Sequence, residues 1–286
     1  MLKRINWRAI LFSFLWLVSL GGLITLMSFI EIKKSTLKYK DVKVLLPGQF
    51  NFIERDEVDR ILMENAGAMV GRDMNDINIH KLENALKANP FIEFAKVYAD
   101  MTGVIQIQIR QRVPVLRVVN MANLNFYIDG NGNKIPLSDN YTAKVLVASG
   151  LIDEDFSGRV DTLNTKMARD LYRIALYIKS DTLWDNQIEQ LFVDLKGDIE
   201  MVPRVGGHKI ILGSADSLQT KFRNLLVFYK KAIPKVGWDT YKTINLKYAN
   251  QIVCEKNIID TSKIMIDISK QISDSTVIET QDLTNF

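Results

Sequence analysis

One uninterrupted apolar segment near the N-terminus, residues 9–30, constrains this chain more than any other feature of its sequence. Its 22 residues, AILFSFLWLVSLGGLITLMSFI, include no charged side chain. A helix of that length spans about 33 Å, close to the roughly 30 Å hydrocarbon core of a bilayer, and satisfies its own backbone hydrogen bonds. The segment therefore predicts a transmembrane helix that anchors the rest of the chain.

Two other interpretations of this segment fit less well. A cleaved secretory signal has an apolar region of about 7 to 15 residues and a small-x-small cleavage site. The present run is longer and ends in Ser28-Phe29-Ile30. A buried helix of a soluble protein would carry a polar face, and none is present here. We therefore expect an uncleaved anchor.

The orientation of the anchor follows from the lengths on its two sides. Basic residues flank it on both sides: Lys3, Arg4 and Arg8 before it, and Lys33, Lys34, Lys38 and Lys40 after it. The positive-inside rule therefore hardly distinguishes the two orientations. A short segment before the span and a long segment after it are the usual layout of a signal anchor. We expect residues 1–8 to be a cytoplasmic head, residues 31–41 a polar stalk, and the bulk of the chain to be periplasmic or external.

Charge and cysteine content narrow the possible functions. Residues 9–286 carry 34 basic and 33 acidic side chains, a net charge of +1. A nearly neutral body argues against a nucleic-acid surface, which needs a basic stripe. The single cysteine, Cys254, cannot form an internal disulfide, and we interpret it as a small buried apolar side chain.

Residues 42–114 form the first predicted domain. Residues 42–46 are strand-like, Pro47-Gly48 is a turn, and residues 52–65 are helical; Asn78 could cap a second helix that stops at Asn89-Pro90. Two strands follow, at 92–100 and 104–111. In the second, Ile105, Ile107 and Ile109 alternate with polar residues, which predicts a sheet with one wet face. The pattern predicts an antiparallel hairpin with two helices over one face, in the order β-α-α-β-β.

Three short motifs mark this domain. They are Val44-x-x-Pro47-Gly48, Asn89-Pro90-Phe91-Ile92-x-x-Ala95-x-Val97 and Ile105-x-Ile107-x-Ile109-x-Gln111-Arg112-Val113-Pro114. In this order behind a single anchor, they resemble a POTRA domain of the FtsQ/DivIB family of bacterial cell-division proteins. The resemblance implies a short cytoplasmic head, one span, a POTRA domain and a C-terminal β domain.

Residues 115–255 form the second predicted domain. Strands are expected at 116–120, 124–129, 187–195, 198–203, 207–212, 241–246 and 248–253, with a tight turn at 129–133. Residues 165–180 and 217–233 place apolar side chains at helical spacing. The predicted fold class is thus α+β: a transmembrane helix, a POTRA domain, and a mostly antiparallel β domain with two covering helices. Residues 256–286 form a tail in which 263–268 could add a strand and the end is expected to be disordered.

The second domain also carries motifs similar to the β domain of the same family. They are Tyr127-Ile128-Asp129-x-x-Gly132, Ile211-Leu212-Gly213 and Ile244-Asn245-Leu246-Lys247-Tyr248. The resemblance therefore covers about residues 1–255.

Catalytic and metal-binding constellations are not apparent in the sequence. His80 and His208 lack neighbouring ligands and are expected to be solvated, as is the acidic cluster Asp153-Glu154-Asp155. Asp129-x-Asn131-x-Asn133 matches the start of a calcium loop, but Lys134 and Asn140 occupy the sixth and twelfth positions, so a hairpin turn is the better interpretation. We expect no catalytic residue, no cofactor and no metal.

With no catalytic pattern in the sequence, we interpret the chain as a binding protein. An unpaired strand at the edge of a sheet is the most direct way for such a protein to bind another chain. The predicted last strand contains Lys247, Tyr248, Ala249, Asn250, Gln251, Ile252 and Val253. The resemblance implies that this strand receives a strand from an FtsB-type protein, which travels with an FtsL-type protein. Tyr248 matches the family's aromatic position and is the first candidate anchor, with packing in its own core as the alternative.

The resemblance implies a non-enzymatic, single-pass scaffold of the divisome at the septum of the bacterial inner membrane. It would link early and late division proteins through FtsB/FtsL-type partners, and its POTRA domain would recruit other divisome proteins. Two alternatives stay open: a membrane-anchored envelope enzyme acting on a glycan or peptide, and a POTRA-containing outer-membrane assembly or secretion module. The enzyme needs an acid pair or a Ser/His/Asp set facing one cleft, and the module needs many alternating barrel strands.

Overall fold

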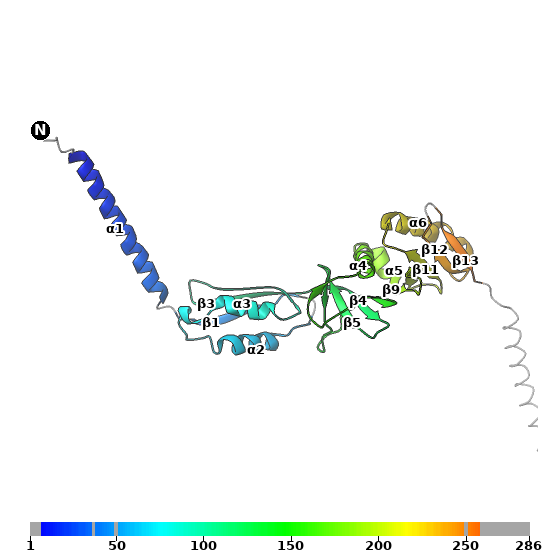
Figure 1. Ribbon diagram of the computed structural model, residues 1–286, viewed down its shortest axis with the longest axis horizontal. Coiled ribbons are helices and arrows are strands. Elements are labelled where there is room, and N and C mark those ends of the chain that lie inside the picture. Colours follow the sequence, from blue (N-terminus) through cyan, green and yellow to red (C-terminus); the bar gives the residue numbers. More distant parts are fainter. Residues whose placement is uncertain (1–6, 36–37, 49–50, 249–250, 258–286) are drawn as a thin grey trace, which may run out of the picture. The chain divides into compact units, whose positions relative to one another are not determined.

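A computed structural model describes residues 7–35, 38–48, 51–248 and 251–257 of the chain (Figure 1). The contacts divide these residues into two compact units. The first comprises Met1–Arg117, Asn125–Val145 and Asp155–Leu163, and the second comprises Val118–Leu124, Leu146–Glu154 and the chain from Asn164 onward. The predicted strand at residues 263–268 lies outside the described residues.

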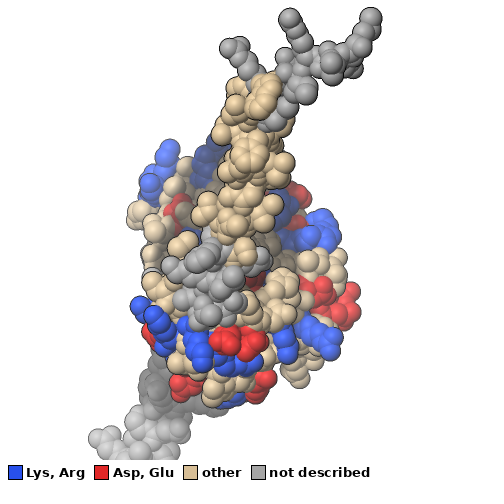
Figure 2. Space-filling view, turned by 90° about the vertical axis from the view of Figure 1, so that its left-hand side faces the viewer, with Lys and Arg blue, Asp and Glu red and all other residues tan. Residues whose placement is uncertain are grey.

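Helix α1, Trp7–Ser35, contains the predicted anchor. Its stretch Leu11–Ser28 is entirely exposed, and it is the one helix in the described part of the chain that is long and apolar enough to cross a membrane. Figure 2 shows the helix surface free of Lys, Arg, Asp and Glu along this stretch, while charges of both signs are interspersed over the rest of the visible face. The helix thus exposes apolar side chains all round, as a lipid-facing span requires.

The predicted stalk, residues 31–41, is not a separate element. Helix α1 continues to Ser35, and Tyr39 is only 1% exposed within the core of the first domain. The Tyr39 amide donates to the Arg72 carbonyl at 2.9 Å, and the next strand begins at Asp41. The prediction of a polar stalk failed because lysines flank Tyr39 in the sequence. A single large ring between charged residues gives no apolar pattern, although it can be buried by itself.

The first domain has the predicted β-α-α-β-β order. Its elements are β1 Asp41–Leu45, α2 Arg55–Ala66, α3 Ile79–Lys87, β2 Ile92–Ala99 and β3 Val104–Gln111, with an unpredicted 3₁₀ turn, η1 Met74–Asp76. The strand order is β1-β3-β2, with β1 parallel and β2 antiparallel to β3. The Asn78 side chain accepts from the Lys81 amide at 2.9 Å, which confirms it as the cap of α3.

The core of this domain lies between the sheet and the two helices. Ile105, Ile107 and Ile109 are at most 2% exposed, while Gln108 and Arg110 of the same strand face water. The alternation therefore reports one covered and one wet face, as predicted. The helices contribute Val58, Leu62, Leu82 and Leu86 to the same cluster.

Four short strands follow, and they introduce the second predicted domain. They are β4 Pro114–Asn120, β5 Asn125–Asp129, β6 Asn133–Ile135 and β8 Asp161–Thr162. In the first unit, β6 pairs antiparallel with both β5 and β8. Strand β8 was not predicted, because two residues are too few to show a period.

The second unit contains most strands of the larger sheet. Its elements are β7 Leu146–Gly150, α4 Lys166–Lys179, α5 Thr182–Gln187, β9 Ile188–Val193, β10 Ile199–Pro203, β11 Lys209–Gly213, α6 Leu218–Lys231, α7 Ile233–Val236, β12 Tyr241–Asn245 and β13 Val253–Lys256. Strands β7–β9 and β11–β12 pair parallel, and the remaining pairs in this unit are antiparallel. The mostly antiparallel sheet and its two long helices, α4 and α6, are confirmed; β7, α5 and α7 were not predicted.

Three hairpin turns repeat one hydrogen-bond pattern. An aspartate accepts from the amides two and four residues later, and a glycine with positive φ stands three residues after it: Asp100 with Gly103, Asp129 with Gly132, and Asp194 with Gly197. The carboxylate replaces the missing strand partner of those amides. The glycines are required because their φ values of 79 to 87° disfavour other residues.

Candidate partner-binding edge

Strand β13 is the last strand of the sheet in the second unit, and it pairs with β12 on one side only. The register places Asn245 opposite Val253, Ile244 opposite Cys254 and Thr243 opposite Glu255. The other edge of β13 has no strand partner among the described residues. An unpaired edge of this kind presents backbone donors and acceptors that another strand can use.

The predicted position of the last strand is wrong, because only its final residue, Val253, lies in β13. It was placed at Lys247–Val253, but β13 begins at Val253, where the prediction ended. Lys247 and Tyr248 lie in the connection between β12 and β13, as do Gln251 and Ile252. Ala249 and Asn250 lie outside the described residues. The edge itself is therefore formed by Val253, Cys254, Glu255 and Lys256.

Side-chain hydrogen bonding explains why β12 stops before Lys247. The Asn245 carboxamide oxygen accepts from the Lys247 amide at 3.0 Å, which closes a local turn. The Leu246 amide donates to the Ile211 carbonyl at 2.8 Å, and the Leu246 side chain is buried at 3% exposure. The Leu246 bond continues the parallel pairing of β12 with β11, whereas the Asn245 bond closes a turn immediately after it, where a continuing strand would stay extended.

Lys247 is fixed against the sheet. Its Nζ donates to Asp198 at 2.6 Å, and that bond raises the pKa of the Lys247 amine. Its aliphatic stem crosses Gly213, where an added Cβ would lie 2.7 Å from Lys247 Cγ. Glycine at position 213 therefore makes room for the lysine stem, and Lys247 is a structural support for the loop as much as a surface charge.

Tyr248 is 51% exposed, so it does not pack in its own core. It borders a groove of about 290 Å³ whose other lining residues come from the start of α6 and the end of β12, including Lys221, Asn224 and Leu246. The Lys221 Nζ donates to the carbonyls of Leu212 at 2.8 Å and Ser214 at 2.9 Å, and burial lowers the pKa of this amine. The groove thus has a rigid polar floor beside an exposed aromatic ring.

A second groove of about 330 Å³ lies along the outer side of α6. Gln251 and Ile252 line it together with the α6 residues Val227 and Phe228. Val227 is 47% exposed, and Asn224 borders both grooves. The connection that leads into β13 thus borders both grooves, and an open strand edge can bind an extended peptide through its backbone while such grooves receive some of its side chains.

The contribution of α6 was missed by the sequence reasoning. The apolar stripe of residues 217–233 was assigned to the core, and Phe222 and Leu225 are indeed buried. Val227 lies outside that stripe, on the polar side of the helix. An apolar residue at such a position was the sequence feature that could have indicated a binding surface on α6. Cys254, expected to be buried, is half-buried on β13, and burial raises the pKa of its thiol.

His208 was expected to be solvated, and this was wrong. It is 2% exposed, its ring stacks on Trp238 with centroids 6.0 Å apart, and its Nε2 lies 2.9 Å from the Tyr229 hydroxyl. Burial lowers the pKa of the imidazole. The neighbouring turn in the sequence suggested exposure, but aromatic residues from α6 and the following loop enclose the ring. His80, by contrast, is exposed as expected.

Glu154 was also expected to be solvated, as part of the cluster Asp153-Glu154-Asp155, and it is buried at 2% exposure. Its carboxylate accepts from the amides of Asn164 and Thr165 and from the Thr165 hydroxyl, at 2.8 to 3.0 Å. It therefore organises the chain before α4, where Thr165 is the N-cap.

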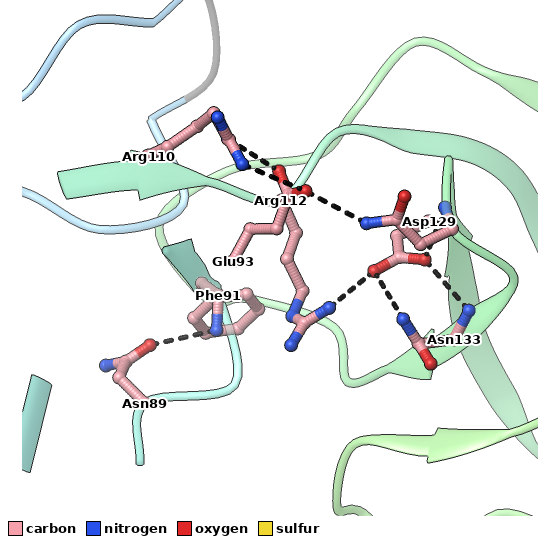
Figure 3. Close-up of polar contacts among 8 residues, drawn as sticks. Asn89, Phe91, Glu93, Arg110, Arg112, Asp129 and Asn133 are labelled. Atoms are coloured by element: carbon pink, nitrogen blue, oxygen red, sulfur yellow. Dashed lines mark hydrogen bonds and ion pairs between the residues drawn. The ribbon is translucent and has the colours of Figure 1, made fainter. Parts of the chain in front are cut away.

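The calcium-like loop at Asp129 is a hairpin turn, as interpreted from the sequence. Both Asp129 oxygens are engaged inside the first unit: Oδ1 by two backbone amides and Oδ2 by Arg112 at 2.7 Å (Figure 3). Next to this pair, Glu93 accepts from Arg110 and from the Asn131 side chain. No group of three potential metal ligands occurs among the residues that the structure describes.

Comparison with known proteins matches the chain in two consecutive parts, close to the two domains predicted from the sequence. Residues 113–255 match the family model described as FtsQ/DivIB, C-terminal related, and residues 41–110 match the model of a POTRA-like domain. A search of curated proteins gave no match.

Proposed function

This chain belongs to the FtsQ/DivIB family of bacterial cell-division proteins, and from that premise we propose that it is a single-pass scaffold which binds a partner strand along β13. The partner is an FtsB-type division protein together with its FtsL-type companion. The family is non-enzymatic, and the proposed role is to connect early and late division proteins at the septum.

The observation that carries this proposal is the open edge of β13, which directly follows Gln251 and Ile252 of the second groove. An added strand would extend the sheet and satisfy the free backbone groups of β13, which gives affinity without a deep pocket. The grooves along α6 would then receive alternate side chains of that strand, which gives specificity. Lys242 and Glu255, 3.6 Å apart and both more than half exposed, leave polar groups at the rim.

Tyr248 is the proposed aromatic anchor of this interface. Exposed tyrosines at a groove combine a large contact area with few rotatable bonds, and such residues are common among binding hot spots. Lys247, the residue before Tyr248, is held against Asp198, which fixes the chain on that side of the tyrosine. We propose that Lys247, Tyr248, Gln251, Ile252 and Val253 contact the partner, with Ala249 and Asn250 between them.

Helix α1 is the proposed membrane anchor, with residues 1–8 in the cytoplasm and the chain from residue 38 onward on the periplasmic or external side. Partners bound by β13 would then be division proteins of the same membrane with external segments. The POTRA-like domain is proposed to recruit further divisome proteins. In a cell depleted of this protein, we expect filaments without septa, and normal septation would contradict the division role.

The direct test is copurification of the detergent-solubilised full chain with the FtsB/FtsL-type proteins of the same cell. A Tyr248→Glu variant places a charge at the proposed anchor, and we expect it to weaken binding by about 30-fold, the effect of a hot-spot residue. Leu195→Glu is the matched control, because Leu195 is 82% exposed in another turn of the same unit.

Three outcomes separate the parts of the proposal. Loss of binding only in Tyr248→Glu supports both the function and the site. Binding retained by both variants keeps the scaffold role and moves the interface away from Tyr248. A folded wild-type chain that binds neither protein contradicts the proposed partners.

A further inference from the structure

Two exposed apolar side chains lie where the first domain follows the anchor helix, and we propose that they insert into the lipid surface. They are Met101, in the turn between β2 and β3, and Val70, in the loop between α2 and η1. Together they would give the domain a second contact with the bilayer besides α1. This inference rests on the proposed role of α1 as a membrane anchor.

Met101 is 96% exposed, the largest fraction of any large apolar side chain among the described residues, and Val70 is 58% exposed. Exposure alone does not carry the inference. Leu195 occupies the same place after Asp194 that Met101 occupies after Asp100, and it is 82% exposed. An exposed apolar residue is thus a recurrent property of this type of turn, and the position of Met101 relative to the anchor is what distinguishes it.

Backbone contacts tie both residues to the segment that follows the anchor. The Lys40 amide donates to the Gly103 carbonyl at 2.8 Å, and the Gly71 amide donates to the Tyr39 carbonyl at 2.7 Å. The approach is close: a Cβ on Gly103 would lie 2.6 Å from the Lys38 carbonyl oxygen. The turn that carries Met101 and the loop that carries Val70 therefore both contact residues 38–40.

Chain length limits how far this part of the domain can lie from the bilayer. Helix α1 ends at Ser35, and Tyr39 is already buried in the domain. Four residues span at most about 14 Å. The helix adds about 7.5 Å between residue 30, where the apolar segment ends, and Ser35. Tyr39 thus lies within about 22 Å of the hydrocarbon boundary, of which the headgroup layer fills roughly 5 to 8 Å.

The turn presents Met101 rigidly. Asp100 accepts from the Thr102 hydroxyl at 2.6 Å, the Thr102 amide at 2.8 Å and the Val104 amide at 3.0 Å. These bonds, the Thr102 side chain first, lower the pKa of Asp100 to about 2, so the carboxylate stays ionised at neutral pH. A rigid turn loses little conformational entropy when its apolar side chain enters a new environment.

The chemistry of the surroundings suits a lipid interface. Lys38 and Lys40 are exposed and contact Gly103 in the turn that carries Met101. Lysines at such positions extend their aliphatic stems along apolar surface and keep the ammonium group at headgroup level. Met101 and Val70 would enter the boundary between headgroups and acyl chains, while Asp100 stays on the aqueous side.

The test uses the full chain in nanodiscs of phosphatidylethanolamine and phosphatidylglycerol. Because Cys254 is the only cysteine, a Cys254→Ser background allows one environment-sensitive fluorophore at a chosen site. Labels are placed through Leu20→Cys in the anchor, Met101→Cys in the proposed contact and Leu195→Cys as the matched control in the same type of turn. Quenching by doxyl lipids is compared with quenching by aqueous iodide.

We expect severalfold stronger lipid-phase quenching at residue 101 than at residue 195. In the Met101→Cys chain, Val70→Asp should reduce this quenching, and Leu137→Asp, at a site 39% exposed, should leave it unchanged. Equal quenching at 101 and 195 while residue 20 is quenched by lipid, or indifference to Val70→Asp, overturns the inference. If the label at residue 20 is not quenched by lipid, the proposed anchor fails, and the inference falls with it.

Discussion

The first unit contains a buried polar junction formed by Gln111, Arg112 and Asp129, and the second unit contains the open edge of β13. These two regions use their polar groups in opposite ways. At the junction, Gln111 is 6% exposed and Asp129 1% exposed, and each accepts hydrogen bonds from more than one partner. At the edge, Glu255 and Lys256 are exposed, and Tyr248 in the preceding connection is 51% exposed. Buried polar groups that accept several hydrogen bonds fix one geometry, whereas groups left in water stay available to a partner.

The junction shows what such fixation achieves. The Gln111 carboxamide oxygen accepts from the amides of Phe52 and Ile53 at 3.1 and 3.3 Å. The Phe52 ring then stacks on Phe91 and meets the edge of Tyr127, with centroids 5.4 and 5.8 Å apart. Residues of the POTRA-like domain and of the β5–β6 hairpin therefore share one cluster. The comparison predicts that junction substitutions change stability and edge substitutions change binding.

The largest expected effect is at Arg112. Arg112→Met keeps most of the apolar stem but leaves the buried Asp129 carboxylate without its cation, and we expect the free energy of unfolding to fall by about 3 kcal/mol. Arg110→Met is the control, because its pair with Glu93 is 63% exposed on the arginine side and should contribute less than about 1 kcal/mol. Urea denaturation followed by circular dichroism measures both. Equal losses would show that burial does not distinguish the two pairs.

A smaller effect is expected at His208, which sharpens the comparison because only one of its ring nitrogens is bonded. Nδ1 is buried without a hydrogen-bond partner among the described residues. Burial lowers the pKa of this imidazole below its ordinary 6.5. As the pH falls below about 6.5, the unfolded state therefore binds more protons than the folded state, and stability is lost, by up to about 1.4 kcal/mol per pH unit.

His208→Gln replaces the ring with a group that does not titrate, so this part of the acid-side loss should disappear. The measurement is the slope of unfolding free energy against pH between about 6.5 and 5, because the substitution also changes the baseline stability. His80→Gln, at an exposed position, should keep the wild-type slope. An unchanged slope in His208→Gln would mean that another group causes the loss.

The same contrast explains which features were predictable from the sequence. In the first domain, Ile105, Ile107 and Ile109 repeat the period of a strand, and the pattern itself determines which face is covered. Near the end of the chain, Lys247 to Val253 is equally compatible with a strand, and the local hydrogen bond between the Lys247 amide and the Asn245 side chain decides against it. The period of the apolar residues in a sequence indicates how a whole helix or strand packs. The residue at which that element ends can depend on a single side-chain hydrogen bond.

The burial of two titratable side chains, Glu154 and His208, was missed for a related reason. Glu154 and His208 stand next to turn-like sequence, and residue type favours exposure for both. Their burial depends on partners that are distant in sequence, such as Tyr229 for His208 and the amides before α4 for Glu154. Helix α6 contributes to the candidate site in the same way, because its nearness to residues 251 and 252 appears only once the chain is folded.

The smallest effect on stability is expected at the edge, where the effect on binding should be largest. Tyr248→Ala removes a half-exposed ring and should change the free energy of unfolding by less than about 0.5 kcal/mol. Loss of a hot-spot aromatic should weaken partner binding by about 2 kcal/mol or more. Arg112→Met should do the reverse and retain binding under conditions where the chain stays folded. If Tyr248→Ala destabilised the second unit as strongly as Arg112→Met destabilises the first, the ring would belong to the core, and the edge would lose its proposed anchor.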